Sequence, residues 1–211
     1  QGAIIGMDQW NEQVFQIAPK LKILARFGVG VDNVDLEAAK RHGVQVVNAA
    51  GLNANAVAEL ALALLFSCAR NISIAGHTMR EGKWEKKAYS KGIELSGKTL
   101  GIIGYGNIGS QLSVLAEALG MSVIFYDLEE KLALGNARRC ETLHELLNEA
   151  DAVTIHVDGR KSNTGFFGEK QFSQMKQNAI FINASRGFVV DLDAHTVTVD
   201  GARVALTYKE F

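Results

Sequence analysis

The stretch that decides the fold, residues 99–127, reads TLGIIGYGNIGSQLSVLAEALGMSVIFYD. Its apolar opening, Leu100 to Ile103, predicts a strand that leads directly into Gly104, Gly106 and Gly109. In a strand–turn–helix unit, the first glycine makes the tight turn, the second lets backbone approach a pyrophosphate, and the third lets the helix pack closely against the strand. The free N–H groups at the start of that helix would then face the phosphates.

The residues after the glycines complete the pattern of a dinucleotide site. A helical apolar stripe follows the turn: Ile108, Leu112, Leu115, Ala116 and Leu119. A second strand, Val123 to Tyr126, ends at Asp127, which stands 18 residues past Gly109. A carboxylate there can accept hydrogen bonds from both ribose hydroxyls and would repel a 2′-phosphate, which favours NAD over NADP. The alternative, a strand–turn–helix unit without a ligand, is disfavoured because every part of the pattern is present.

Composition and charge exclude several classes of protein. The 211 residues are 47% hydrophobic, which is enough for a buried core, and the net charge of −1 does not suit a nucleic-acid surface. The longest apolar run, Ala56 to Phe66, contains Glu59 and is far too short to span a bilayer. No basic start precedes an apolar run, so no signal peptide is expected.

The two cysteines, Cys68 and Cys140, lie in apolar-periodic segments and are expected to be small core residues. Two cysteines make no disulfide framework, which fits a reducing, cytoplasmic location. No metal site is predicted.

Strands and helices alternate along the chain, which predicts an α/β fold of the Rossmann type with a doubly wound parallel sheet. The expected strands are 3–5, 22–25, 44–47, 100–103, 123–126, 152–156 and 179–183, and the expected helices are 12–17, 36–42, 54–69, 72–81, a helix after Gly106, 142–147 and 169–175. Helix 54–69 is apolar on all its faces, so we expect it to be buried nearly all round.

Two further segments carry groups that suit a carboxylate ligand. The loop from Arg26 to Gly30 follows a strand and could present free backbone N–H groups, although a plain glycine turn is an equally good interpretation. Arg186 stands just past the strand that ends at Asn183, where ligands bind in open parallel sheets. Its planar guanidinium could hold a carboxylate with two bonds, or it could be an ordinary surface arginine.

Five segments together resemble the D-isomer-specific 2-hydroxyacid dehydrogenases. They are Arg26 to Asp35, Asn53 with Val57-Ala-Glu59, Met79 to Trp84, the glycine turn with Asp127, and Asn183 to Asp191, all in the family's order. The resemblance covers residues 1–193 and implies NAD-dependent oxidation of a D-2-hydroxy acid, or reduction of the 2-keto acid. It divides the chain into a partial, flavodoxin-like substrate domain (1–52), an NAD-binding domain (53–193) and a tail outside the family (194–211).

The resemblance also implies roles for single residues. The amides of Val29 and Gly30 would hold the substrate carboxylate, Arg26 would meet a phosphate, and Asn53 would lie near the substrate. On the coenzyme side it implies the following residues: Gly104, Gly106, Asn107, Ile108, Gly109 and Asp127 at the diphosphate and ribose, and Ala184, Ser185 and Arg186 beside the nicotinamide. Arg186 would also be catalytic, because it would orient and polarise the carbonyl group. A homodimer through helix 54–69 is implied as well.

The sequence departs from the family in its proton-transfer residues. The family's Pro-His-x-Gly segment has no match, and His195 is interpreted as a surface residue. The tail 191–211 predicts a hairpin, with strands at 196–199 and 203–206 around the turn Asp200-Gly201. Residues 195–211 resemble the start of a response-regulator winged-helix domain, through the run from Val204 to Phe211. Impaired catalysis, a non-catalytic NAD-binding fragment and a fusion therefore stay open, as does the identity of the hydroxy acid.

Overall fold

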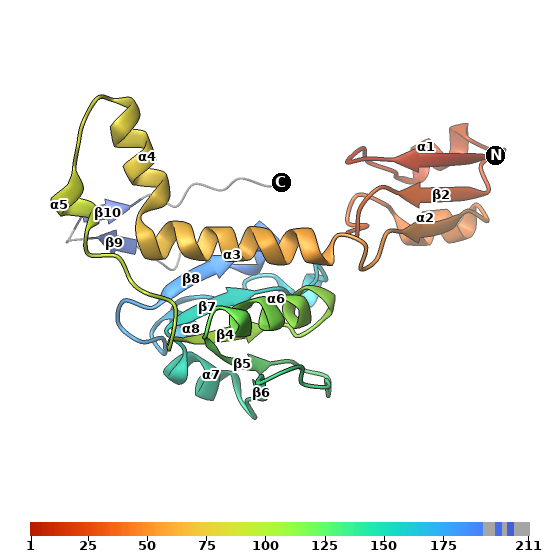
Figure 1. The fold of residues 1–211 in the computed structure, drawn as a ribbon. Helices are drawn as coiled ribbons and strands as arrows, with labels where there is room; N and C mark the ends of the chain where they lie inside the picture. Colours follow the sequence, from red (N-terminus) through yellow and green to blue (C-terminus); the bar gives the residue numbers. More distant parts are fainter. Residues whose placement is uncertain (192–196, 200–201, 205–211) are drawn as a thin grey trace. The chain divides into compact units, whose positions relative to one another are not determined.

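The computed structural model describes residues 1–191, 197–199 and 202–204. The chain divides into two compact units, Gln1–Ala54 and Asn55–Phe211 (Figure 1). The assignment of residues 1–52 to a substrate domain, of 53–193 to an NAD-binding domain and of 194–211 to a separate tail stays a prediction. A division into compact units does not show what each unit binds.

The first unit is a three-stranded parallel sheet in the order β1-β2-β3, with two helices. Its elements are β1 (Gly2–Ile5), α1 (Glu12–Ile17), β2 (Ile23–Arg26), α2 (Leu36–Arg41) and β3 (Gln45–Asn48). Asp35 caps α2, because its carboxylate accepts a 2.9 Å hydrogen bond from the Ala38 N–H. Phe15, Leu24 and Ala38 form the centre of this unit's apolar core.

The second unit contains a five-stranded parallel sheet in the order β6-β5-β4-β7-β8. Its strands are β4 (Thr99–Ile103), β5 (Ser122–Tyr126), β6 (Arg138–Arg139), β7 (Ala152–Ile155) and β8 (Ile180–Asn183). The chain runs outward from β4 to β6 and then crosses back to β7 on the other side of β4. This is the doubly wound topology expected from the sequence, and its switch point lies between β4 and β7.

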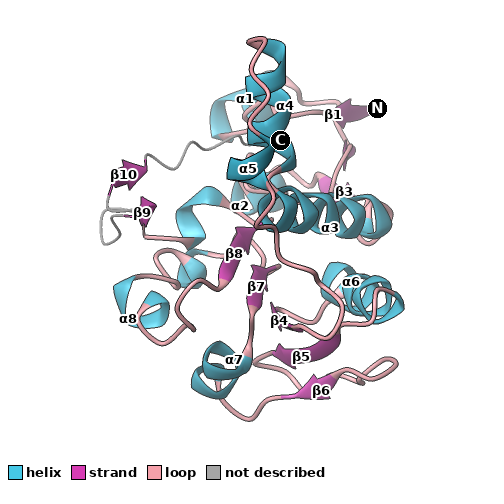
Figure 2. Ribbon diagram, turned by 60° about the vertical axis from the view of Figure 1, so that its left-hand side comes forward, coloured by secondary structure: helices cyan, strands magenta, loops and turns pink. Residues whose placement is uncertain are grey.

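Helices cover both faces of that sheet (Figure 2). Its helices are α3 (Ala54–Arg70), α4 (Ile72–Arg80), α5 (Lys86–Tyr89), α6 (Asn107–Ala118), α7 (Leu143–Glu149) and α8 (Glu169–Phe172), with short 3₁₀ turns at Lys161–Asn163 and Gly187–Val189. Side chains of α3 and α6 pack on one face, and side chains of α7 with Phe167 pack on the other. Each core therefore fixes one helix layer against the sheet.

Helix α3 is less buried than its composition predicts. Only Ala54, Ala58, Ala61, Leu65 and Ala69 are buried, and they form a single helical stripe. Leu60 and Leu64 are 39% and 38% exposed, and Cys68 is also exposed. The expectation of burial on all faces was therefore wrong, as was the expectation that Cys68 is a core residue, whereas Cys140 is buried. The residues of the second unit cover only one side of α3.

Helix α4 continues the helical region expected at 72–81, but it does so after a sharp break. Asn71 adopts a left-handed conformation with φ of 56°, and α4 leaves α3 at an angle of 68°. Within the described chain no single helix is long and apolar enough to cross a membrane. Helices α3 and α4 reach the required length and apolar composition only when they are counted together across this bend.

The end of the chain contains two short strands, β9 (Val197–Val199) and β10 (Ala202–Val204), which pair antiparallel as the hairpin prediction requires. The predicted turn at Asp200-Gly201 and the residue His195 lie outside the described residues.

Candidate dinucleotide-binding site

The turn between β4 and α6 depends on Gly104. Its φ is 90°, and a Cβ placed on it would lie 2.9 Å from the carbonyl carbon and oxygen of His156. The backbone angle and the close approach of β7 both require glycine at this position. The chain can therefore leave β4 and start α6 within a few residues.

Gly109 lies in a tightly packed contact, whereas Gly106 faces open space. A Cβ on Gly109 would lie 2.4 Å from the Gly104 carbonyl oxygen, so this glycine allows the first turn of α6 to touch the turn below it. A Cβ on Gly106 would meet nothing within 4 Å, so the space in front of Gly106 is open. Gly106 is also the N-cap of α6 and offers no side-chain acceptor to the first amides, those of Asn107 and Ile108. Within the described residues no backbone acceptor is seen for these amides, and an open space beside such helix amides fits a diphosphate.

Asp127 is held in place by backbone N–H groups on both sides. Its Oδ2 accepts a 2.7 Å hydrogen bond from the amide of Tyr105, and its Oδ1 accepts a 2.9 Å bond from the amide of Glu129. The carboxylate is partly exposed and has further lone pairs for ligand hydroxyls. The glycine turn and the acid are therefore physically joined, which sequence spacing alone does not establish.

Tyr105 is a positioning residue that the sequence analysis missed, because it occupies a variable place between the glycines. Its ring is buried and stacks on Phe125 with centroids 3.8 Å apart. Its hydroxyl lies 2.7 Å from Ser113 Oγ of α6 and accepts a 3.2 Å bond from the Leu134 N–H. The side chain thus ties the turn to β5, to α6 and to the loop after β5.

The strand register places four candidate positions in one row. Ile103 pairs with Tyr126 on one side and with Ile155 on the other, and Ile155 pairs with Asn183. The next residue of each strand therefore continues the row as Asp127, Gly104, His156 and Ala184. This row crosses the switch point at the carboxyl edge of the sheet, which is where open α/β sheets bind ligands.

His156 was not predicted as a site residue, yet it lies at the centre of that row. Its Nε2 is 3.0 Å from the hydroxyl of Thr154, while its Nδ1 is buried and has no hydrogen-bond partner within the described residues. Burial lowers the pKa of the imidazole from 6.5 to about 4. A neutral ring therefore lies beside the diphosphate turn at physiological pH.

The segment after β8 is shaped by Asn183, a third residue to which the sequence analysis gave no role. Its Oδ1 accepts bonds from the N–H and the hydroxyl of Ser185, at 3.0 and 2.8 Å. Its Nδ2 donates a 3.0 Å bond to the carbonyl of Arg186. One amide side chain thus fixes the turn that carries Ala184, Ser185 and Arg186 at the same carboxyl edge as Asp127.

The substrate residues implied by the resemblance lie in the first unit. Arg26 is the last residue of β2, and its guanidinium donates to the Phe27 carbonyl and lies 3.0 Å from the Met7 sulfur. The Val29 carbonyl accepts a 2.6 Å bond from Asn48, and Gly30 follows it in the loop. Asn53 is exposed in the turn before α3. Their role at a substrate stays a prediction.

Taken together, the glycine turn, the fixed Asp127 and the switch-point location define a dinucleotide-binding α/β domain. Among the residues described here, no cluster of three metal-ligating side chains is present.

Comparison with known proteins gives the same class. The profile of the "D-isomer specific 2-hydroxyacid dehydrogenase, NAD binding domain" family matches residues 62–206. The chain therefore belongs to this family, and its second unit carries the family's NAD-binding domain. The match extends beyond residue 193, so it includes part of the segment that was interpreted as a separate tail; the separate origin of that tail stays a prediction.

Several relatives are D-3-phosphoglycerate dehydrogenases. The chain is 47% identical over 182 residues to the one from Haemophilus influenzae, covering 86% of this chain and 44% of that protein. It is 44% identical over 195 residues to D-3-phosphoglycerate dehydrogenase 1 of Saccharomyces cerevisiae, covering 92% and 41%. The NAD⁺-bound 3-phosphoglycerate dehydrogenase of Entamoeba histolytica superimposes with a TM-score of 0.76 at 28% identity, covering 92% and 58%. The chain thus spans less than half the length of these two curated relatives.

The buried His156 predicts a specific pH dependence of stability. Between pH 6.5 and about 4 the unfolded chain binds a proton on this imidazole that the folded chain does not bind, so stability falls as the pH falls through that window. The full effect is roughly 3 kcal/mol in the free energy of unfolding. Urea unfolding measured across this range should show a shallower pH slope for His156→Asn than for the wild type. An unchanged slope, or an equal change in the exposed-site control His77→Gln, would contradict this account.

Proposed function

We propose that this chain carries the coenzyme-binding part of an NAD-dependent dehydrogenase for D-2-hydroxy acids, with D-3-phosphoglycerate as the substrate. The observation that carries the proposal is the open, amide-lined turn at Gly106 with Asp127 fixed beside it by the Tyr105 N–H. The D-3-phosphoglycerate dehydrogenase relatives support the choice of substrate. With that substrate the chain would act in serine biosynthesis, in the cytoplasm.

On the coenzyme side, each residue group has a separate task. The first amides of α6 would hold the diphosphate, and Asp127 would accept hydrogen bonds from the adenosine ribose. When bound, NAD accepts the hydride from the carbon that carries the substrate hydroxyl. Arg186, held in its turn by Asn183, would bind the substrate carboxylate and polarise the oxygen on the reacting carbon.

On the substrate side, the loop after β2 supplies candidate amides. Phe27 N–H donates to the Ile5 carbonyl and Gly28 N–H to that of Arg26, so these two amides are already used. Within the described residues no backbone acceptor is seen for the amides of Val29 and Gly30. Two adjacent free N–H groups suit a carboxylate, which supports their proposed role together with Arg26 and Asn53.

A second candidate function is an NAD-binding module without turnover. It is favoured by the missing match to the family's Pro-His-x-Gly segment in these 211 residues. General acid–base catalysis by such a histidine contributes about 10²–10⁴-fold. Coenzyme binding does not depend on such a histidine, whereas the rate of turnover does.

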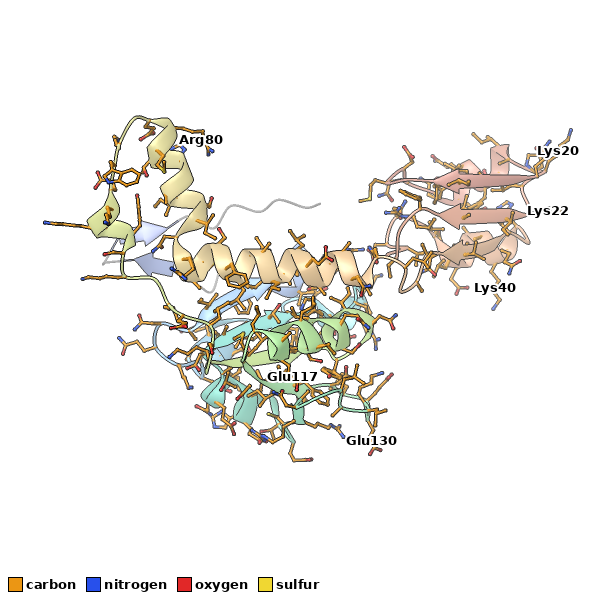
Figure 3. The ribbon with its side chains drawn as sticks, in the orientation of Figure 1. Lys20, Lys22, Lys40, Arg80, Glu117 and Glu130 are labelled. Atoms are coloured by element: carbon orange, nitrogen blue, oxygen red, sulfur yellow. The ribbon has the colours of Figure 1, made fainter. Side chains whose placement is uncertain are left out.

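The coenzyme assignment predicts a change of selectivity in Asp127→Asn. The neutral side chain makes weaker bonds to the ribose hydroxyls and no longer repels a 2′-phosphate. Calorimetric titration should show NAD binding weakened about tenfold, with a reduced preference for NAD over NADP. Glu130→Gln, at an exposed acid in the same loop, is the matched control and should leave both affinities unchanged (Figure 3). Failure of the wild type to bind NAD would refute the proposal.

The dehydrogenase assignment is tested by NADH formation from D-3-phosphoglycerate, with D-lactate and D-glycerate as comparison substrates. We expect turnover that falls on the order of 10²-fold in Arg186→Ala, because one positioned donor to the reacting oxygen is removed. Lys170→Ala, an exposed cation on α8, should keep the wild-type rate. NAD binding without any turnover would favour the non-catalytic module instead.

We also propose a homodimer through the exposed side of α3 and α4. Helix α4 has no buried residue, and its Ile72 and Ile74 are 55% and 51% exposed. Together with Leu60 and Leu64 of α3 they leave apolar side chains that the described residues do not cover. Apolar surface of this kind is typical of a protein–protein interface.

The proposed homodimer predicts the molar mass of the protein in solution. Light scattering after gel filtration should give a dimeric mass for the wild type and a monomeric mass for the double variant Leu64→Arg, Ile74→Arg, since two buried charges per protomer would oppose association. Leu128→Arg, at an 80% exposed leucine in the loop after β5, should remain dimeric. A monomeric wild type would exclude this interface.

A further inference from the structure

The loop that follows β7 lies at the switch point of the sheet. His156 begins this loop, and it stands between Gly104 and Ala184 in the row set by the strand register. Asp127 lies on the far side of Gly104 in the same row. The loop after β7 therefore starts two strands away from Asp127, the proposed ribose-binding acid. Because adjacent strands are about 4.8 Å apart, the backbones of Asp127 and His156 are separated by about 10 Å.

An ion pair organises this loop. The Arg160 Nε donates to both carboxylate oxygens of Asp158, at 2.7 and 2.9 Å, and its Nη2 donates to Oδ2 as well. Asn163 Nδ2 donates to the Asp158 carbonyl at 2.9 Å and to its Oδ1 at 3.0 Å. Asp158 thus holds one edge of the guanidinium in a fixed plane and is itself fixed to the loop.

Most of the Arg160 side chain remains accessible to solvent. The Arg160 side chain is 62% exposed although its Nε edge is bound to Asp158. A guanidinium bound at its edge can still stack an aromatic ring on its face, since the two interactions use different directions. The arrangement is therefore preorganised, because Asp158 removes part of the rotamer freedom that binding would otherwise have to remove.

Arg160 also lies within electrostatic reach of the ribose-binding acid. The hydrogen-bonded Asp158 is the main cause of its raised pKa, and the carboxylates of Glu129 and Asp127 raise that pKa further. Leu128, next to Asp127, is 80% exposed. An exposed apolar side chain thus follows the acid directly, and an exposed guanidinium lies within electrostatic reach of it.

Resting on the coenzyme assignment above, we propose that Arg160, held by Asp158, stacks on the adenine base of the bound dinucleotide. A ribose gripped at its hydroxyls by Asp127 places its base next to that acid, because the base is bonded directly to the sugar. Arg160 is therefore an affinity-determining residue at the adenine end, and it is distinct from the residues that hold the diphosphate and the ribose.

The test is the affinity for NAD and for AMP of the wild type, Arg160→Ala and Arg160→Gln, measured by calorimetry at about 0.05 M and about 0.5 M NaCl. We expect both variants to weaken both ligands roughly three- to tenfold, the size expected for one guanidinium on an aromatic face. The loss should persist at high salt because stacking is short-ranged. Lys161→Ala removes an exposed cation one residue away and should change either affinity less than about twofold.

Three results would overturn the adenine contact while leaving the coenzyme assignment intact. They are unchanged affinities in the Arg160 variants, a loss that disappears at high salt, and an equal loss in Lys161→Ala. The last two would identify a general effect of charge on the phosphates. If the wild type binds neither NAD nor AMP, the coenzyme assignment and the Arg160 proposal both fail. A failure of the Arg160 proposal alone can therefore be told apart from a failure of the coenzyme assignment.

Discussion

The contact between the first turn of α6 and the turn below it is the constraint on which the site depends. A Cβ on Gly109 would come within 2.4 Å of the Gly104 carbonyl oxygen, and a Cβ on Gly104 would strike the backbone of His156. Without both glycines the helix would have to move away from β4. The amides that α6 offers to an anion would then no longer open at the carboxyl edge of the sheet.

From this contact the rest of the site follows along the sheet edge. The Tyr105 N–H, which lies in the glycine turn, donates a hydrogen bond to Asp127, and the Tyr105 ring packs the same turn against Phe125. On the other side, β7 brings His156 against Gly104, and Asn183 shapes the segment that carries Arg186. Thus one short turn contacts the ends of β5 and β7, which are far apart in the sequence, and the end of β8 lies in the same row as the partner of β7.

Much of this arrangement could be predicted from the sequence because it is local. The glycine spacing, the apolar stripe of α6 and the capping residue Asp35 each act over a few residues, and the structure contains each of them. What the sequence did not reveal depends on distant partners. Three features depend on which elements become neighbours: the hydrogen bond from Tyr105 to Asp127, the burial of a His156 nitrogen that has no partner among the described residues, and the exposed side of α3. Composition marked α3 as apolar, but it could not say how many of its faces this unit covers.

The central claim is that a diphosphate binds at the amides that begin α6. Amide NMR of the full chain, titrated with NAD, tests it most directly. The account predicts that the largest shift changes fall on the N–H groups of Tyr105 to Gly109, and that they are lost in Gly106→Ala, whose added methyl group has room in the protein itself. Saturable NAD binding that leaves these amides unchanged, or that persists equally in Gly106→Ala, would contradict it.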